Sequence, residues 1–278
     1  MQRDLGHRRP AAGLGTVPFA AVAAPPTGAA EPELATAKGE SMCGRFVQAS
    51  SPELLVARFG VDEVTAPAHE PSYNVAPRAS VYGVRDRAEE TGRRRYLSEL
   101  RWGLIPSWAR DEKVGDRMIN ARAESLAGKP AYERAFRRHR CLVPAEGFYE
   151  WQRRGARKQP SFIHRRDGEP MAFAGLWAAW RNGEGADDDW IRSCTIVTTS
   201  ANATVAPLHD RMPVVLEERD WDAWLDPDAP DVDALAGLLR PASDDLLVAY
   251  PVATAVNSAD NDGPQLVERV EPQPTLGL

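Results

Sequence analysis

The stretch RCLVPAEGFYEW at residues 140–151 decides the fold class. It has the pattern of a strand, and similar runs follow at 160–165, 171–180, 190–199, 212–216 and 246–253, after earlier ones at 80–84 and 95–104. Short helical patterns lie between them, at 51–60, 123–128, 131–136, 218–225 and 231–239. Because strands outnumber helices of crossover length, we predict an α+β domain. Its sheets should be curved, barrel-like and mostly antiparallel, with short peripheral helices.

The chain divides at Met42 into two parts of different composition. Residues 1–41 repeat Ala and Pro without apolar periodicity, a composition that cannot bury a core. We therefore predict that residues 1–41 are a disordered extension, absent from or removed in the mature protein. Residues 42–278 show no internal repeat and no linker, and we predict a single domain there.

The bulk composition excludes several classes of protein. Of the 278 residues 43% are hydrophobic and 27% are charged, as in an ordinary globular protein. No run approaches the roughly 18 apolar residues of a membrane span, so we expect no membrane partner. Three cysteines without close spacing argue against a disulfide framework and favour a reducing cytoplasm. We expect a cytoplasmic monomer.

The net charge of −6 hides a change of sign along the chain. Residues 85–181 contain 22 Lys and Arg against 13 Asp and Glu, whereas residues 182–278 contain 5 against 19. One interpretation is a basic face for nucleic acid, and the other is two solvated surfaces of opposite sign. Charge alone leaves both open.

Several short polar stretches with Gly or Pro are typical of functional loops. They are MCGRF (42–46), YNVAP (73–77), RWGLIPSWA (101–109), INARAES (119–125), PAEGFYEW (144–151) and LHDRMP (208–213). The spacing of Cys and His does not match a zinc site, and a G-x-S-x-G motif is absent. Cys141 and Cys194 lie in apolar runs and should be buried. We expect no metal and no cofactor.

MCGRF, YNVAP, RWGLIPSW, NAR, EGFYEW and HDRMP, in this order, closely resemble the SOS response-associated peptidase family. The resemblance runs from Met42 to about Glu268 and includes VNSADNDGPQL near the C-terminus. Bacterial and vertebrate members shield abasic sites in single-stranded DNA by cross-linking to them. Members begin with Met-Cys, and the Met is removed to expose the Cys. In this chain the pair is Met42-Cys43, so the extension departs from the family pattern.

The resemblance assigns the covalent chemistry to Cys43 as residue one. A free α-amine has a pKa of about 7.7–8.0 and a thiol about 8.5, so both are nucleophilic near neutral pH. The amine can condense with the aldehyde of an opened abasic sugar, and the thiol can then close a thiazolidine. An internal cysteine has only an amide nitrogen, which cannot do this. The chain either starts at Met42 or is cut after it, and the family is proposed to cut itself there.

The other site residues carry over by motif. Asn120 should hydrogen-bond the opened sugar or the Cys43 amine, and Glu150 should shuttle protons, which calls for a raised pKa in a partly dry pocket. His209 should donate to the sugar ring oxygen. For DNA, the resemblance implies phosphate contacts from arginines, stacking on tryptophans and a cleft lined by YNVAP. These residues are Arg45, Asn74, Pro77, Trp108, Arg122, Trp151 and Arg211.

Two other functions remain open from the residues. A cysteine peptidase acting on proteins would use the Cys43 thiol but not its amine. A non-covalent reader of modified or single-stranded DNA would use the basic surface but neither nucleophile. The favoured hypothesis is an abasic-site cross-linking or lyase-type activity on single-stranded DNA, with autoproteolytic exposure of Cys43.

Overall fold

The computed structural model describes residues 44–271 except positions 91, 155–156, 182–189 and 230. Contacts within the chain divide it between Gly39 and Glu40, and the architecture below belongs to the second unit, residues 40–278. The predicted disordered extension, 1–41, lies outside the described residues. Within the described part, no helix combines the length and apolar character needed to cross a membrane.

Five strands form a closed, barrel-like ring. In ring order these are β11 (Trp190–Ser200), β10 (Met171–Arg181), β7 (Arg140–Ala145), β4 (Ser80–Glu89) and β5 (Gly92–Trp102). Neighbours pair antiparallel until β5 meets β11, where Ser193 pairs with Arg101 and Cys194 with Trp102 in parallel. This short parallel contact closes the ring and leaves the outer parts of both strands available to other segments.

Three short strands extend the ring. β6 (Asn120–Arg122) pairs parallel and β12 (Arg211–Pro213) antiparallel with β11, whereas β2 (Glu63–Val64) pairs parallel with β5. Of the twelve strand pairings that the described residues make, nine are antiparallel. The predicted α+β class with curved, mostly antiparallel sheets is therefore confirmed.

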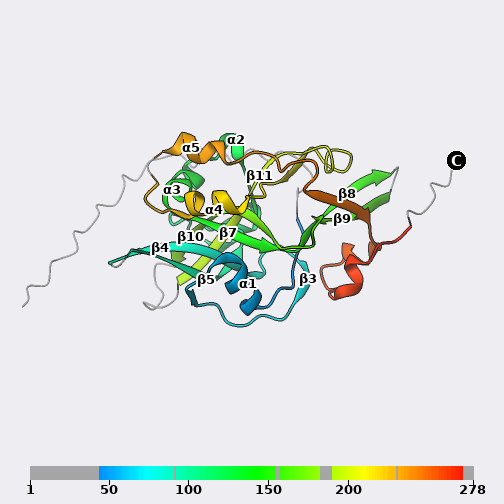
Figure 1. Ribbon diagram of the computed structural model, residues 1–278, viewed down its shortest axis with the longest axis horizontal. Helices are drawn as coiled ribbons and strands as arrows, with labels where there is room; N and C mark the ends of the chain where they lie inside the picture. Colours follow the sequence, from blue (N-terminus) through cyan, green and yellow to red (C-terminus); the bar gives the residue numbers. More distant parts are fainter. Residues whose placement is uncertain (1–43, 91, 155–156, 182–189, 230, 272–278) are drawn as a thin grey trace, which may run out of the picture. The chain divides into compact units, whose positions relative to one another are not determined.

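A second sheet has five strands and packs against the ring through shared core residues. Its order is β13 (Leu247–Pro251), β9 (Arg157–Arg165), β8 (Gly147–Arg154), β1 (Phe46–Gln48) and β3 (Ser72–Val75). Figure 1 shows β8 and β9 extending away from β4, β7 and β10, with the red C-terminal segment beside them. β1 and β3 come from stretches that the sequence indicated as irregular, and so does β6.

The stretch 140–151 is not one strand but two, because the chain leaves the ring at Glu146. The carboxylate of Glu146 accepts hydrogen bonds from the backbone N–H of Ala49 (2.6 Å) and Ser50 (3.2 Å) and from the Ser50 hydroxyl. Gly147 follows, and a Cβ there would clash with the ring of Phe162 on β9. A bound carboxylate and a close backbone approach therefore end β7 and begin β8 in the other sheet.

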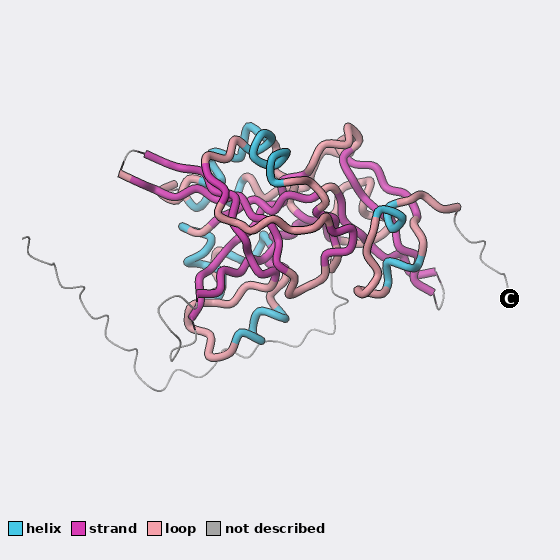
Figure 2. The backbone as a smooth tube through the Cα atoms, turned by 90° about the horizontal axis from the view of Figure 1, so that it is seen from below, coloured by secondary structure: helices cyan, strands magenta, loops and turns pink. Residues whose placement is uncertain are grey.

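The helices are short and lie around the strands, as Figure 2 shows. α1 (Pro52–Phe59) begins at Ser51, which accepts a hydrogen bond from the Leu54 N–H, and ends at Gly60 with φ of 62°. The other helices are α2 (Ala123–Leu126), α3 (Pro130–Arg138), α4 (Glu218–Leu225) and α5 (Val232–Gly237), with 3₁₀ turns η1 (Glu112–Arg117), η2 (Thr254–Asn257) and η3 (Pro264–Val267). All five predicted helical segments are present.

Two large apolar clusters use opposite faces of the same strands. On β10, Ala172, Ala174 and Leu176 pack with the helices, whereas Met171 and Phe173 pack in a cluster with residues of β1, β5, β7, β8 and β11. This is the two-residue alternation of a strand buried on both sides. Trp180, Trp221 and Trp224 are buried, Trp180 in a small separate cluster, whereas Trp177 is only half-buried.

Candidate functional site

Most candidate residues lie on segments that meet at one buried cluster, here called the central cluster. It includes Phe46, Val75, Ile119, Phe148 and Met212, and Leu208 packs against it. These residues are next to Arg45, Asn74, Asn120, Arg211 and His209 in the chain, and Phe148 is two positions before Glu150. The packing of this cluster therefore brings five separate stretches of sequence to one region.

Glu150 lies on β8 and is 2% exposed, so its carboxyl group is shielded from water. Side chains alternate along a strand, and Glu150 therefore faces the same side as Phe148 and Gln152. The Gln152 side-chain amide donates a 3.1 Å hydrogen bond to the Pro207 carbonyl, two residues before His209. Glu150 thus faces the side on which the His209 loop meets β8.

His209 makes two contacts through Nδ1 that exclude each other chemically. Nδ1 accepts a 3.0 Å hydrogen bond from the Arg211 backbone N–H and also lies 2.9 Å from Asp210 Oδ1. The backbone donor is held by the fold, whereas the Asp210 side chain is 85% exposed and can move. We assign Nδ1 as the acceptor, which places the imidazole hydrogen on Nε2.

Asn120 and Arg122 lie on β6, next to β12 across β11. Asn120 pairs with Ile196 and Arg122 with Thr198, while Arg211 on β12 pairs with Ser200. Asn120 is half-buried, and its carbonyl accepts a 3.3 Å hydrogen bond from the Tyr132 hydroxyl. Arg122 is exposed. The sheet therefore groups the NAR and HDRMP motifs.

Arg211 is held by an ion pair that the sequence did not indicate. Its guanidinium donates to both carboxylate oxygens of Glu124 (2.6 and 2.8 Å) and to the Thr198 carbonyl (2.7 Å). The paired guanidinium holds the pKa of Glu124 below its usual value. A phosphate that binds both nitrogens of Arg211 must displace Glu124, whose side chain is 56% exposed.

A second group of candidates gathers around residues 256–261. Arg45 Nη1 donates to Asn74 Oδ1 (2.8 Å) and to the Val256 carbonyl (3.0 Å), and burial lowers the pKa of Arg45. Asn74 is 4% exposed, and its amide donates to the carbonyls of Ser258 and Asn261, both at 2.8 Å. Asn74 therefore anchors the C-terminal segment, and its predicted contact with DNA stays a prediction.

The two predicted stacking tryptophans differ in their surroundings. Trp108 is 55% exposed in the loop after β5, as the sequence indicated. Trp151 is half-buried, faces the opposite side of β8 from Glu150, and donates a 2.7 Å hydrogen bond to Asn257 Oδ1. Pro77 is half-buried between β3 and β4. Trp108 and Pro77 belong to neither group of side chains described above.

Sequence reasoning assigned no role to the segment VNSADN at 256–261, although it holds Arg45, Asn74 and Trp151. Its Asn, Ser and Asp composition is typical of turns that hydrogen-bond the backbone, which was the available signal. Next to it, Asp262 accepts from the Tyr73 N–H (2.6 Å) and the Ser72 hydroxyl (2.8 Å). The sequence does not reveal this network, because the donors Ser72 and Tyr73 precede Asp262 by about 190 residues.

Cys43 lies outside the described residues, which begin at Gly44. Phe46 pairs with Phe148, Val47 pairs with Gly147, and the Tyr149 N–H donates to the Arg45 carbonyl at 3.0 Å. Continued by one residue, this register brings Gly44 level with Glu150. Glu150 is therefore on the strand beside the one that leads back to Cys43.

The two described cysteines are not candidates for a nucleophile. Cys141 and Cys194 are fully buried and free, as predicted. Burial raises the pKa of the Cys141 thiol well above its usual value and that of Cys194 to about 12. Over the described ranges, no group of three His, Cys, Asp or Glu residues could hold a metal ion.

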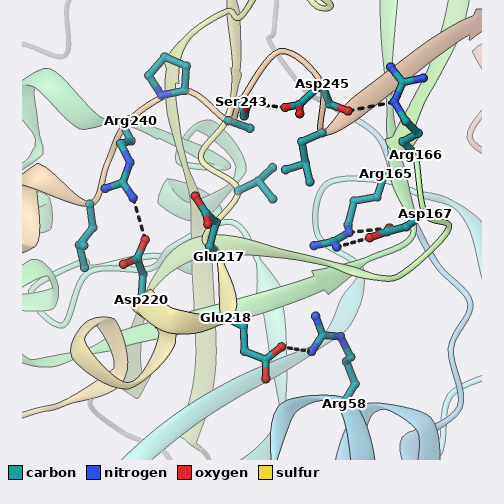
Figure 3. A pocket seen from close by; sticks show the side chains of 15 residues that line it. Arg58, Arg165, Arg166, Asp167, Glu217, Glu218, Asp220, Arg240, Ser243 and Asp245 are labelled. Carbon is teal, nitrogen blue, oxygen red and sulfur yellow. Dashed lines mark hydrogen bonds and ion pairs between the residues drawn. The ribbon is translucent and has the colours of Figure 1, made fainter.

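A cavity of about 670 Å³ lies away from all these candidates, between α4, β9 and the segment 238–246. Its lining is rich in charge, and three of its four arginines pair with carboxylates of the same lining, as Figure 3 shows. Arg58 binds Glu218 at 2.7 Å, Arg240 binds Asp220 at 3.0 Å, and Arg165 binds Asp167. Such paired charges leave little to attract a charged ligand.

The chain matches the model of the SOS response associated peptidase (SRAP) family over residues 42–259. It is 41% identical over 229 residues to the abasic site processing protein YoqW of Bacillus subtilis, covering 82% of this chain and 99% of that one. For abasic site processing protein HMCES of Gallus gallus the identity is 31%, covering 73% and 67%.

Solved structures share the fold. A Bacteroides thetaiotaomicron protein matches with a TM-score of 0.71 at 23% identity, covering 82% of this chain and all of that one. A phage-related protein of Bordetella bronchiseptica matches with a TM-score of 0.58 at 31% identity, covering 76% and 94%. The family match spans most of the chain, and the relatives agree along most of their length. The chain therefore belongs to the SOS response associated peptidase family.

Proposed function

We propose that the protein processes abasic sites in single-stranded DNA by forming a covalent link through Cys43. The relatives at 30–41% identity are named abasic site processing proteins, which supports the lesion as substrate. The observation that carries the proposal is the placement of Glu150. Its buried carboxyl lies on the strand beside β1, level with Gly44, and faces the His209 loop.

The proposed reaction joins two nucleophiles of one residue to one aldehyde carbon. The Cys43 α-amine adds to the aldehyde of the opened sugar, and loss of water gives a Schiff base. The thiolate then adds to the imine carbon, and the nitrogen takes a proton to complete a thiazolidine ring. The amine exists only after hydrolysis of the Met42–Cys43 peptide bond, or when the chain starts at Met42 and loses that residue.

Glu150 and His209 are the residues proposed to transfer protons in this reaction. Glu150 can protonate the departing hydroxyl during imine formation, since a carboxyl group shielded from water can hold a proton until it is needed. His209, with its hydrogen on Nε2, can donate to the ring oxygen of the closed sugar and favour the open aldehyde. Asn120, on β6 beside this region, is proposed to orient the sugar by hydrogen bonding.

DNA binding is proposed to use both groups of candidates. Arg122 is exposed on the same strand as Asn120 and can bind a phosphate directly. Arg211 can bind a phosphate once its ion pair with Glu124 is broken. Arg45, Asn74 and Trp151 together shape the neighbouring surface around residues 256–261. Phosphate contacts and stacking are both independent of base sequence, which suits a lesion that has no base.

The N-terminal residue tests the proposal. Two preparations, one beginning at Cys43 and one retaining residues 1–42, should be verified by intact mass and incubated with an abasic oligonucleotide. Only the first should give an adduct that persists on a denaturing gel, because only it has a free Cys43 amine. Equal adduct from both preparations would rule out the thiazolidine. A complex that dissociates in denaturant would indicate a non-covalent reader.

Trp108→Ala should weaken binding to intact and abasic single strands alike. Stacking on an exposed indole contributes about 1–3 kcal/mol per base, so we expect a loss of roughly 5- to 150-fold in affinity. Fluorescence anisotropy with a labelled strand measures it. Leu54→Ala is the control, because it removes a comparably exposed apolar side chain, on α1, that has no proposed contact with DNA. Unchanged affinity would show that Trp108 lies off the DNA path.

A further inference from the structure

A second cavity, of about 440 Å³, lies where the barrel-like ring is incompletely closed. β5 and β11 pair only at Arg101–Trp102 and Ser193–Cys194. Before that contact, Trp190, Ile191 and Arg192 of β11 and Ser98 and Glu99 of β5 line the cavity instead of pairing with each other, and Arg78 lines it as well. We call this cavity the β5–β11 groove.

The groove lining holds three arginines, Arg78, Arg101 and Arg192, against one carboxylate, Glu99, so its charge is positive in excess. Arg78 and Arg192 are exposed, and neither forms an ion pair with another described residue. Behind Ser98 lies Arg85, which is only 8% exposed and donates to the Ser98 hydroxyl at 2.9 Å. Burial, followed by repulsion from Arg192 and Arg87, lowers the pKa of Arg85 to about 10. An anion in the groove would relieve this repulsion.

Arg85 is held by aromatic rings rather than by a carboxylate. Its guanidinium lies 5.0 Å from the Trp177 ring centroid and 5.6 Å from that of Tyr96, and no ion pair to it forms within the described ranges. The 670 Å³ cavity differs in this respect, because three of its four arginines pair with carboxylates of the same lining. The β5–β11 groove therefore has an excess of cationic groups where the larger cavity has none.

The groove is linked to the candidate site by chain connectivity and by hydrogen bonds through the buried Trp102. Arg78 directly follows Pro77, and its backbone N–H donates to the Trp102 carbonyl at 2.8 Å. The Trp102 indole in turn donates to the Ile119 carbonyl at 2.9 Å, and Ile119 precedes Asn120. Arg78, the residue after YNVAP in the chain, is thus where the groove begins.

We propose that the β5–β11 groove binds the single-stranded DNA that flanks the abasic site on one side, with Arg78 and Arg192 on phosphates and Trp190 stacked on a base. The inference rests on the proposed function, since it assigns a second stretch of the same substrate. Trp190 is 49% exposed, and the Arg181 guanidinium lies 5.2 Å from its ring centroid, which supports the indole from one side.

The double variant Arg78→Asn, Arg192→Gln tests the groove. Arg78 has a φ of 77°, a conformation that Asn tolerates better than Arg, so the first substitution should not impair folding. Binding should be measured on strands with a non-reactive abasic analogue, in three forms. One has a single nucleotide on each side of the lesion, and the others are extended by about six nucleotides on the 5′ or the 3′ side.

We expect the double variant to bind one of the two extended strands roughly 10-fold or more weakly and the short strand as the wild type does. For the responding strand, the slope of log K against log salt should fall by about 1.4, or about 0.7 for each lost phosphate contact. Trp190→Ala should weaken the same strand by roughly 5- to 150-fold. The side that responds gives the polarity of the DNA.

The matched control is Arg166→Gln, Arg219→Gln, which makes the same change in net charge at two exposed arginines near the other cavity. It should leave all three affinities unchanged. Equal affinity of the groove variant and the control for every strand would overturn the inference. A wild-type protein that binds these strands but forms no adduct with reactive ones would count against the proposed function alone.

Discussion

Cys43→Ser, in protein that begins at residue 43, is expected to abolish the adduct that survives denaturation. The variant keeps the α-amine and should still form a Schiff base with the abasic aldehyde. A serine hydroxyl is far less acidic than a thiol with a pKa of about 8.5, so it does not close the ring near neutral pH. Borohydride, which reduces the imine to a stable amine, should restore a covalent product. Denaturing gels with and without borohydride measure both species.

The buried thiols supply the control for this experiment. Cys194→Ala removes a thiol that is fully buried and whose pKa is raised to about 12, and it should leave the yield of adduct unchanged. A Cys43→Ser protein that gives wild-type yields without borohydride would show that the thiol takes no part in the stable link. If the activity needs the Cys43 thiol but persists when the α-amine is acetylated, the protein is a cysteine peptidase rather than a cross-linking protein.

Glu150→Gln is expected to slow cross-linking by roughly 10²–10⁴-fold, the usual contribution of a general acid–base group. Gln has nearly the same shape as Glu, but its amide cannot deliver or accept the proton at the step that loses water. The same substitution should slow the reversal of a preformed adduct, since ring opening uses the same proton transfer in the opposite direction. Single-turnover time courses, in both directions, measure the two rates.

Glu63→Gln on β2 is the matched control, because it makes the same chemical change at a side chain that is 43% exposed on the edge of the ring. Its rates should equal those of the wild type. Thermal unfolding of Glu150→Gln should show a folded protein, since an uncharged amide is no more costly to bury than a carboxylate. If the folded variant cross-links at the wild-type rate, then Glu150 is a structural residue of β8.

The sequence by itself determined the features that depend on neighbouring residues. Ser51 and Gly60 define α1 because a cap and a left-handed residue act within one turn of the helix. The burial of Cys141 and the exposure of Trp108 followed from the polarity of the few residues around each. The family motifs also named the candidate residues, since a motif match needs only their order.

The tertiary structure alone decided the features that depend on distant pairing. Glu146 splits 140–151 into strands of two sheets because its carboxylate binds Ala49 and Ser50, almost a hundred positions away. Likewise, Glu124 holds Arg211 because β6 and β12 both meet β11. The incomplete contact of β5 with β11 leaves the groove beside Arg192. Bringing distant strands together costs chain entropy, and the packing of the whole core offsets this cost. No local sequence pattern therefore specifies which distant partners meet.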